Sequence, residues 1–136
     1  MKKSQLSILL SKLQTFKSPK AELEQYPTDG ETASMILWTA NELGDIENKT
    51  IADLGCGTGI LGLGALLLGA KKVHFIDKSE AAIRTAKENM RFLENELRIN
   101  LKDKSNFLIG DISLFNKEAD TVIENPPFGT KAPHLD

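Results

Sequence analysis

From Thr50 onward, short apolar runs alternate with longer segments of helical periodicity. The longer segments, 60–68 and 79–97, predict helices, and Ser79 is a suitable N-cap for the second. This alternation is typical of an α/β fold, in which helices cover a parallel sheet. The apolar runs predict these strands: Thr50–Leu54, Lys72–Ile76, Asn106–Ile109 and Ala119–Glu124.

Length and composition fit a single folded domain. Of the 136 residues, 40% are hydrophobic, which is enough to form one core. Another 26% are charged, and the chain lacks the excess charge of disordered proteins. The net charge of −2 gives no overall sign of nucleic-acid binding, and no segment resembles a signal peptide or a membrane span. Cys56 is the single cysteine and permits no intrachain disulfide or metal-ligand cluster, so we predict a cytoplasmic protein with no bound metal. We expect Cys56 to be a small loop residue and His74 to be a packed or edge histidine.

The segment before the first strand predicts two helices joined by a loop. In the N-terminal helix, residues 1–20, leucines and a phenylalanine recur at three- and four-residue steps over Leu6–Phe16. This helix either packs on the core or, because it carries five lysines and no acid, serves as an RNA-contacting arm. Residues 21–30 predict a loop, and Ala33–Leu43 predicts a second helix that ends at Gly44.

A glycine-rich turn joins the first strand to the following helix and reads Asp53-Leu54-Gly55-Cys56-Gly57-Thr58-Gly59. Glycines allow a ligand to approach the backbone closely. The stretch 57–62 also matches the dinucleotide fingerprint, in which a pyrophosphate lies at the N-terminus of the helix. Asp53 would repel a pyrophosphate and attract the ammonium group of a methionine-like ligand, so it favours S-adenosylmethionine over NAD.

Two more acids follow the next strands at the same edge of the predicted sheet. Asp77 comes about 20 residues after the turn, where an acid can accept hydrogen bonds from two ribose hydroxyls. Asp111 follows the third strand and can accept a hydrogen bond from an adenine amine. Each acid alone could be a solvated strand end or a helix cap. Three acids at successive strand ends favour a cofactor that contains adenosine.

The fourth strand leads directly into Asn125-Pro126-Pro127-Phe128. In an ordinary loop the two prolines would form a rigid turn and Phe128 would pack in the core. Beside a cofactor site, the amide oxygen of Asn125 and the carbonyl of Pro126 can both accept from a planar NH2 group, which directs the nitrogen lone pair at a methyl donor. Phe128 can stack on the planar group that bears the amine, such as an unpaired nucleobase.

With these residues, the chain resembles the class I S-adenosylmethionine-dependent methyltransferases that methylate exocyclic amines. It is similar in particular to the archaeal and eukaryotic RNA adenine methyltransferases related to methyltransferase-like protein five. The resemblance implies a Rossmann-like class I sheet with helices on both faces, and it makes residues 21–136 the N-terminal portion of the S-adenosylmethionine-binding domain. The matching segments are 23–28, 52–59 and 125–131.

The resemblance also implies a reaction and a role for individual residues. The reaction is N6-methylation of an adenine in RNA, in that branch a ribosomal RNA of the small subunit. The target base would be held by Asn125, Pro126, Pro127 and Phe128. The cofactor would be bound by a lid, the glycine turn and the strand ends, which comprise Gln25, Thr28, Asp53, Gly55, Gly57, Thr58, Gly59, Ile60, Asp77, Asp111 and Ile112.

The chain departs from the family pattern in two places. After Thr28 it reads Asp29-Gly30-Glu31-Thr32, which is more acidic and polar than the family pattern. The family sheet has seven strands, whereas this chain ends shortly after the fourth, so we expect a fragment or a chain that needs a partner to cover an apolar edge strand. The eukaryotic relatives work with a small zinc-binding activator protein that covers such an edge, which implies a similar partner here.

Several activities besides RNA adenine methylation stay open from the sequence. The same clamp would serve a guanine N2 amine, a DNA adenine or a protein glutamine amide, although Phe128 and the loop 25–28 favour an RNA adenine. A nucleotide-binding oxidoreductase would bind NAD and would have no need for Asn125. A non-catalytic module that binds S-adenosylmethionine is also compatible with the sequence.

Overall fold

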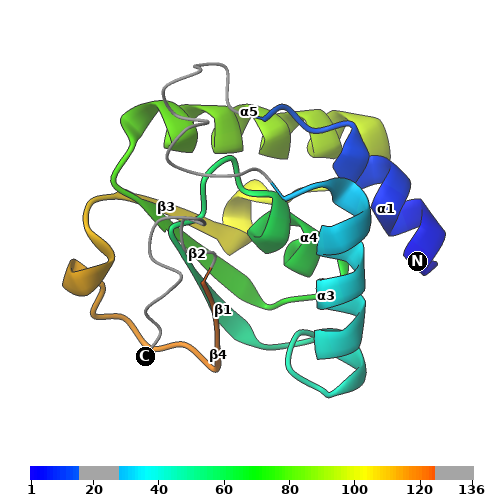
Figure 1. The fold of residues 1–136 in the computed structure, drawn as a ribbon, viewed down its shortest axis with the longest axis horizontal. Coiled ribbons are helices and arrows are strands. Elements are labelled where there is room, and N and C mark those ends of the chain that lie inside the picture. Colours follow the sequence, from blue (N-terminus) through cyan, green and yellow to red (C-terminus); the bar gives the residue numbers. More distant parts are fainter. Residues whose placement is uncertain (16–27, 125–136) are drawn as a thin grey trace, which may run out of the picture.

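Every strand and helix predicted from Thr50 onward is present, and each boundary lies within two residues of the prediction. The computed structural model describes residues 1–15 and 28–124 (Figure 1). Two short 3₁₀ helices, η1 and η2, flank the third strand and were not predicted. The elements in chain order are α1 (Lys3–Ser11), α3 (Gly30–Glu42), β1 (Thr50–Leu54), α4 (Ile60–Leu67), β2 (Lys72–Asp77), α5 (Glu80–Leu97), η1 (Lys102–Lys104), β3 (Ser105–Ile109), η2 (Ile112–Leu114) and β4 (Thr121–Glu124).

The four strands form one parallel sheet in the order β3-β2-β1-β4. The chain runs outward from β1 through β2 and β3, and then returns to place β4 on the other side of β1. The direction of strand addition therefore reverses between β1 and β4. Ligands of open parallel sheets bind outside the carboxyl ends of the strands at such a reversal, which makes this edge the expected position of the site.

Helices α4 and α5 cover the same face of the sheet. Phe107, Phe75 and Asp53 are register neighbours on β3, β2 and β1, so their side chains lie in one row on one face. Gly62 of α4 packs on this row, because a Cβ built on it would lie 2.9 Å from both Phe75 Cζ and Asp53 Oδ2. Lys87 of α5 places its Nζ 5.7 Å from the centroid of the Phe107 ring, which stacks on Phe75 at 4.6 Å.

Helices α1 and α3 pack against each other and against α4 (Figure 1). Gly30, at the start of α3, permits the close contact, since a Cβ there would lie 2.7 Å from the backbone nitrogen of Ser11. Of the N-terminal segment, Leu6, Leu9, Leu10 and Leu13 are buried in the common core. This burial confirms the interpretation of the N-terminal segment as a helix packed on the core.

Both N-terminal helices have boundaries that differ from the prediction. Helix α1 ends at Ser11, although the pattern predicted a helix that continues toward Phe16, which lies outside the described residues. The chain leaves the helix because the backbone of Gln14 pairs with the side chain of Asn89 instead. Helix α3 begins at Gly30, inside the predicted loop, because the Asp29 carboxylate accepts a hydrogen bond from the Thr32 N–H at 2.7 Å and caps the helix.

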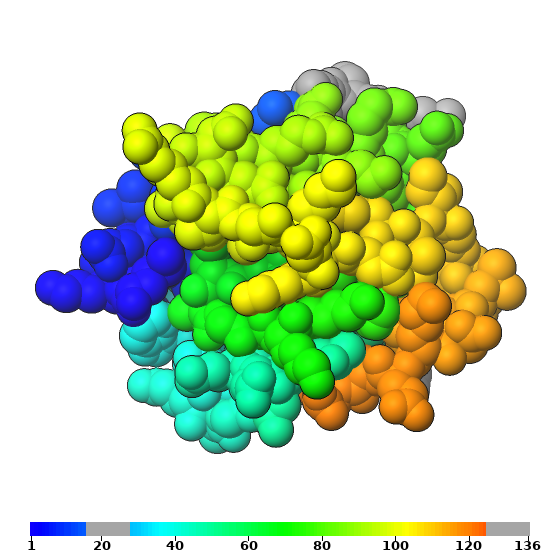
Figure 2. All heavy atoms as spheres, turned by 180° about the vertical axis from the view of Figure 1, so that it is seen from behind, coloured from blue at the N-terminus to red at the C-terminus, as the bar shows by residue number. Residues whose placement is uncertain are grey.

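The N-terminal helix and the segment that leads to β4 lie at opposite sides of the molecule, as both views show (Figures 1 and 2). Strand β4 pairs with β1 on one side, and Val122 is 57% exposed. Within the described residues, β4 is therefore the edge strand that the sequence predicts. No helix in these ranges is long and apolar enough to cross a membrane.

Candidate functional site

The turn after β1 requires its glycines. Gly55, Gly57 and Gly59 have φ angles of 72°, 57° and 89°, values that residues with a side chain seldom adopt. The backbone N–H groups of Gly55 and Cys56 both donate to the carbonyl of Ile76, at 2.8 and 2.9 Å. These bonds attach the turn to the end of β2, so the first two strand ends form one rigid unit.

Asp77 strengthens this attachment through its side chain. One carboxylate oxygen accepts from the N–H of Gly57 and the other accepts from the N–H of Ser79, both at 2.8 Å. The residue is only 1% exposed. Because a carboxylate oxygen can accept two hydrogen bonds, the bonds among the described residues leave acceptor capacity on each oxygen of Asp77.

Asp53 lies beneath α4 and is also 1% exposed. Its Oδ2 accepts a hydrogen bond from the N–H of Gly62 at 3.0 Å, in the first turn of that helix. Burial raises the pKa of Asp53 to about 7, the bond from Gly62 opposes the rise, and the charge of Asp77 adds to it. The carboxyl group therefore exists in both protonation states near neutral pH, and its structural contact is with the start of α4.

Asp111 has a different environment at the end of β3. It is exposed, and its Oδ1 accepts from the N–H of Ser113 at 2.8 Å, which caps η2. This bond lowers the pKa of Asp111, and Lys78 contributes a smaller effect in the same direction. The neighbouring Gly110 N–H donates to the carbonyl of Asp77 at 2.9 Å, so the turn after β3 is attached to the end of β2.

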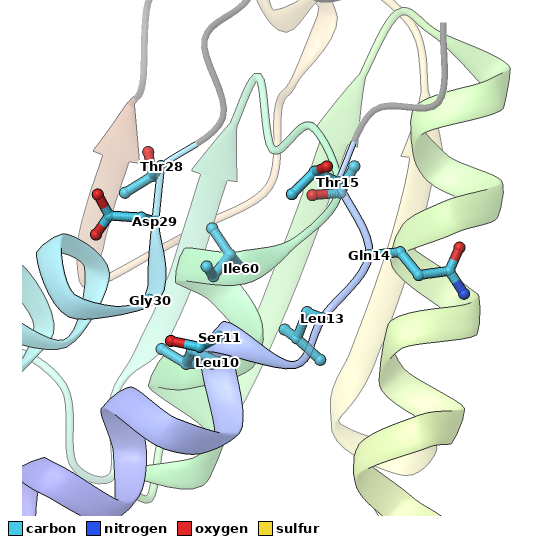
Figure 3. A pocket seen from close by; sticks show the side chains of 10 residues that line it. Leu10, Ser11, Leu13, Gln14, Thr15, Thr28, Asp29, Gly30 and Ile60 are labelled. Atoms are coloured by element: carbon cyan, nitrogen blue, oxygen red, sulfur yellow. The ribbon is translucent and has the colours of Figure 1, made fainter.

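A pocket of about 180 Å³ lies beside the glycine turn (Figure 3). Three residues predicted to bind the cofactor, Thr28, Thr58 and Ile60, line it together. The opposite wall is the chain segment that follows α1, including Gln14, whose side chain points toward α5 and away from the pocket (Figure 3). Gln25 and Asn125 to Phe128, which were also predicted to form the site, lie outside the described residues.

Asn89 is a buried residue behind the pocket that the sequence analysis missed, and it bonds to two of the lining residues. It is 1% exposed, its Oδ1 accepts from Gln14 N–H at 2.8 Å, and its Nδ2 donates to the carbonyls of Gln14 at 3.0 Å and Thr58 at 2.9 Å. The available signal was its position on the apolar face of α5, between Ala86 and Leu93. A polar residue on such a face normally has buried hydrogen-bond partners.

Cys56 and His74 are both buried. Burial, followed by the charges of Asp53 and Asp77, raises the pKa of the Cys56 thiol well above its usual value. His74 is buried in β2, with its Nδ1 3.0 Å from Asn106 Nδ2, and burial lowers its pKa. No group of three or more His, Cys, Asp or Glu in the described ranges could hold a metal ion.

Comparison with known proteins decides the family. Residues 29–125 match the family model of ribosomal protein L11 methyltransferase (PrmA). The chain belongs to this family. The predicted α/β fold and the resemblance to the enzymes related to methyltransferase-like protein five are both confirmed.

Three relatives match nearly the whole chain. The uncharacterized protein MJ0284 of Methanocaldococcus jannaschii is 36% identical over 140 residues and covers 100% of this chain. METTL5 of Danio rerio, named an rRNA N(6)-adenosine-methyltransferase, is 41% identical and covers 96%. The crystal structure of PH1948 from Pyrococcus horikoshii, provisionally assigned as an RNA methyltransferase, is 49% identical over 100% of this chain with a TM-score of 0.82. The chain spans 63%, 62% and 64% of their respective lengths.

Proposed function

We propose that this chain binds S-adenosylmethionine and forms part of an enzyme that methylates the N6 amine of an adenine in ribosomal RNA. The observation that carries the proposal is the position of the glycine turn, which Asp77 fixes at the carboxyl ends of β1 and β2. That position lies beside β4, and β4 leads directly into Asn125-Pro126-Pro127-Phe128. A cofactor site and an amine clamp therefore meet where the strand order reverses.

The described residues fit the cofactor. The glycines at positive φ carry no side chain that would keep a ligand away from the backbone of the turn. Thr28, Thr58 and Ile60 line the adjoining pocket, so this side would hold the methionine portion together with Gln25 and Gly55. Asp77 has acceptor capacity for the ribose hydroxyls. At the end of β3, Asp111 would accept from the adenine amine and Ile112 would contact the adenine ring.

Asp53 has a less direct proposed role at the same turn. It holds the first turn of α4 through Gly62, and its charge lies beneath the segment that would receive the methionine ammonium group. Binding of a cation above it would favour the ionised form. Asp53 thus contributes to cofactor binding through the position of α4 and through its negative charge.

The substrate side is proposed from the residues that follow β4. S-adenosylmethionine supplies an activated methyl group when bound. The amide oxygen of Asn125 and the carbonyl of Pro126 would accept both protons of the adenine NH2, which directs the nitrogen lone pair at the methyl group, while Pro127 and Phe128 would enclose and stack on the base. Catalysis then depends on position and electrostatics rather than on a strong general base.

A protein substrate is the second candidate, because the matching family model is described as a methyltransferase of ribosomal protein L11. The relative named for ribosomal RNA is 41% identical and covers 96% of this chain, which supports RNA as the first choice. Guanine N2, a DNA adenine and a protein glutamine amide are further candidate acceptors, and the chain could also be a non-catalytic binding module. Each of these possibilities predicts a different product, so one assay can distinguish them.

The test is methyl transfer from S-adenosylmethionine with a radioactive methyl group to small-subunit ribosomal RNA, DNA and ribosomal protein in parallel. We expect label in the RNA as N6-methyladenosine, identified by mass spectrometry of the nucleosides. Asn125→Ala should abolish transfer while S-adenosylhomocysteine affinity stays within about two-fold, since the clamp is distinct from the cofactor residues. Label in protein, DNA or guanine would replace the substrate assignment, and cofactor binding without transfer to any substrate would support the non-catalytic module.

We also propose a cytoplasmic location and a small partner protein that covers the edge of β4. The support for the partner is the exposure of Val122 on a strand that pairs on one side, because an open apolar edge is prone to aggregation. A charged residue at position 122 should weaken the binding of such a partner without changing the affinity for the cofactor, because β1 separates β4 from β2 and its Asp77.

A further inference from the structure

Asn89 connects two walls of the pocket with a single buried amide. One wall is the chain segment that follows α1, and the other is the glycine turn at Thr58. Asn89 bonds to both N–H and C=O of Gln14 and to the carbonyl of Thr58, so both hydrogens of its amide nitrogen are used. Its side chain lies behind these two residues, on α5, and is not among the pocket lining.

These contacts fix the backbone rather than side chains. The paired bonds to Gln14 resemble one rung of a sheet, and they begin where the hydrogen bonds of α1 end. The bond to Thr58 comes from the same amide nitrogen, so the separation of the two walls is set by the geometry of one planar group. Because Asn89 is 1% exposed, an amide hydrogen that lost its partner there would have no water to bond to.

We infer that Asn89 is a positioning residue of the cofactor site, which holds the segment at Gln14 and the turn at Thr58 in the arrangement that S-adenosylmethionine requires. The inference rests on the proposed function, since it assumes that this pocket receives the cofactor. A residue that only stabilised the fold would affect unfolding without a specific effect on ligand affinity. A positioning residue affects affinity in a protein that is still folded.

The variant Asn89→Asp tests the amide directly. It keeps the shape and the acceptor for the Gln14 N–H, but it places a second oxygen against the carbonyls of Gln14 and Thr58. Titration calorimetry with S-adenosylhomocysteine at pH 8 should show an affinity loss of about ten-fold or more relative to wild type. At pH 6 a buried carboxyl group regains its proton and one donor, so part of the affinity should return.

Asn95→Asp is the matched control, because Asn95 is an exposed asparagine on the same helix. It adds the same charge to α5, and its affinity should stay within about two-fold of wild type at both pH values. Circular dichroism at the titration temperature establishes that each variant is folded. Equal affinity of Asn89→Asp and wild type, or an equal loss at pH 6 and pH 8, would overturn the inference while the proposed function stands.

A second measurement on the wild type covers the case in which Asn89→Asp does not fold. Hydrogen exchange of the Gln14 amide, which donates to Asn89, should slow when S-adenosylhomocysteine binds. The Asp103 amide, which donates to the side chain of Asn100 outside the site, should not change. Unchanged exchange at Gln14 in the bound protein overturns the inference alone. Failure of the wild type to bind S-adenosylhomocysteine overturns the proposed function, and the inference with it.

Discussion

The turns after β1 and β3 both carry glycine and aspartate at the end of a parallel strand and both bond to the end of β2, yet the burial of their aspartates differs. The first turn is held by bonds from Gly55 and Gly57 to β2, and Asp53 and Asp77 beside it are almost fully buried. In the second turn, Asp111 is exposed and bonds to the N–H of Ser113, two residues further along the chain. Similar sequence patterns therefore produce one preassembled surface and one locally capped surface.

This contrast indicates how the two ends of the proposed cofactor would be bound. The methionine and ribose portions would meet a surface that the chain has already organised, so little order must be gained on binding. The adenine would meet an exposed turn whose acid bonds to its own helix start. Substitutions in the first turn should therefore have large effects on stability and affinity, and the same substitutions in the second should have small effects.

The strongest consequence of this contrast should be the pH dependence of stability through Asp53. Its pKa is about 7 in the folded protein, against roughly 3.9 in an unfolded chain, so folding takes up a proton between these values. The contribution of protonated Asp53 to the free energy of unfolding is therefore fully present below about pH 4. This contribution is lost as pH rises to about 7, and the free energy of unfolding falls by up to about 4 kcal/mol. Asp53→Asn should remove this dependence in urea unfolding measured from pH 4 to pH 8.

Asp111→Asn provides the contrasting control. The pKa of Asp111 is lowered, so its contribution is present above the unfolded pKa and is lost as pH falls through the folded pKa. The free energy of unfolding of Asp111→Asn should therefore lie below that of wild type at neutral pH and approach it as pH falls, which is a slope opposite to that of Asp53. Parallel pH curves for wild type and Asp53→Asn would contradict the buried, proton-sharing state that we assign to Asp53.

A smaller effect is expected from one added methyl group in each region. At Gly62 a Cβ would collide with the Phe75 ring and lie 2.9 Å from Asp53 Oδ2, whereas at Gly110 no atom lies within 4 Å. Gly62→Ala should lower the free energy of unfolding by about 2 kcal/mol, the overpacking cost less the gain in helix propensity. Gly110→Ala should change it by about 0.5 kcal/mol or less in the same urea titration. Equal effects would mean that the first turn is no more tightly packed than the second.

Much of this architecture follows from local patterns in the sequence. The strand ends and the N-cap at Ser79 were predicted because apolar periodicity and capping chemistry are short-range properties. The glycine turn was predicted for the same reason, since positive φ angles restrict the residues that can occupy it. The family resemblance extended these predictions to the residues that follow β4.

Long-range contacts account for what the sequence did not reveal. The end of α1 depends on Asn89, which is 75 residues away from Gln14 in the chain. The glycine at position 30 permits the close approach of Ser11, a long-range contact that no local pattern encodes. The sequence predicted a cofactor contact for each of Asp53, Asp77 and Asp111, but only the packing of α4 and the turn distinguishes the buried pair from the exposed residue.

The cofactor assignment can be tested by calorimetric titration of the chain with S-adenosylmethionine, S-adenosylhomocysteine and NAD, together with Asp77→Ala and Asp111→Ala. We predict saturable binding of the first two ligands and none of NAD. Asp77→Ala should lower the affinity for S-adenosylhomocysteine by about 100-fold, and Asp111→Ala should lower it by about ten-fold or less, because Asp77 is buried and also fixes the turn. Binding of NAD alone, or wild-type affinity in Asp77→Ala, would contradict the assignment of this turn as the cofactor site.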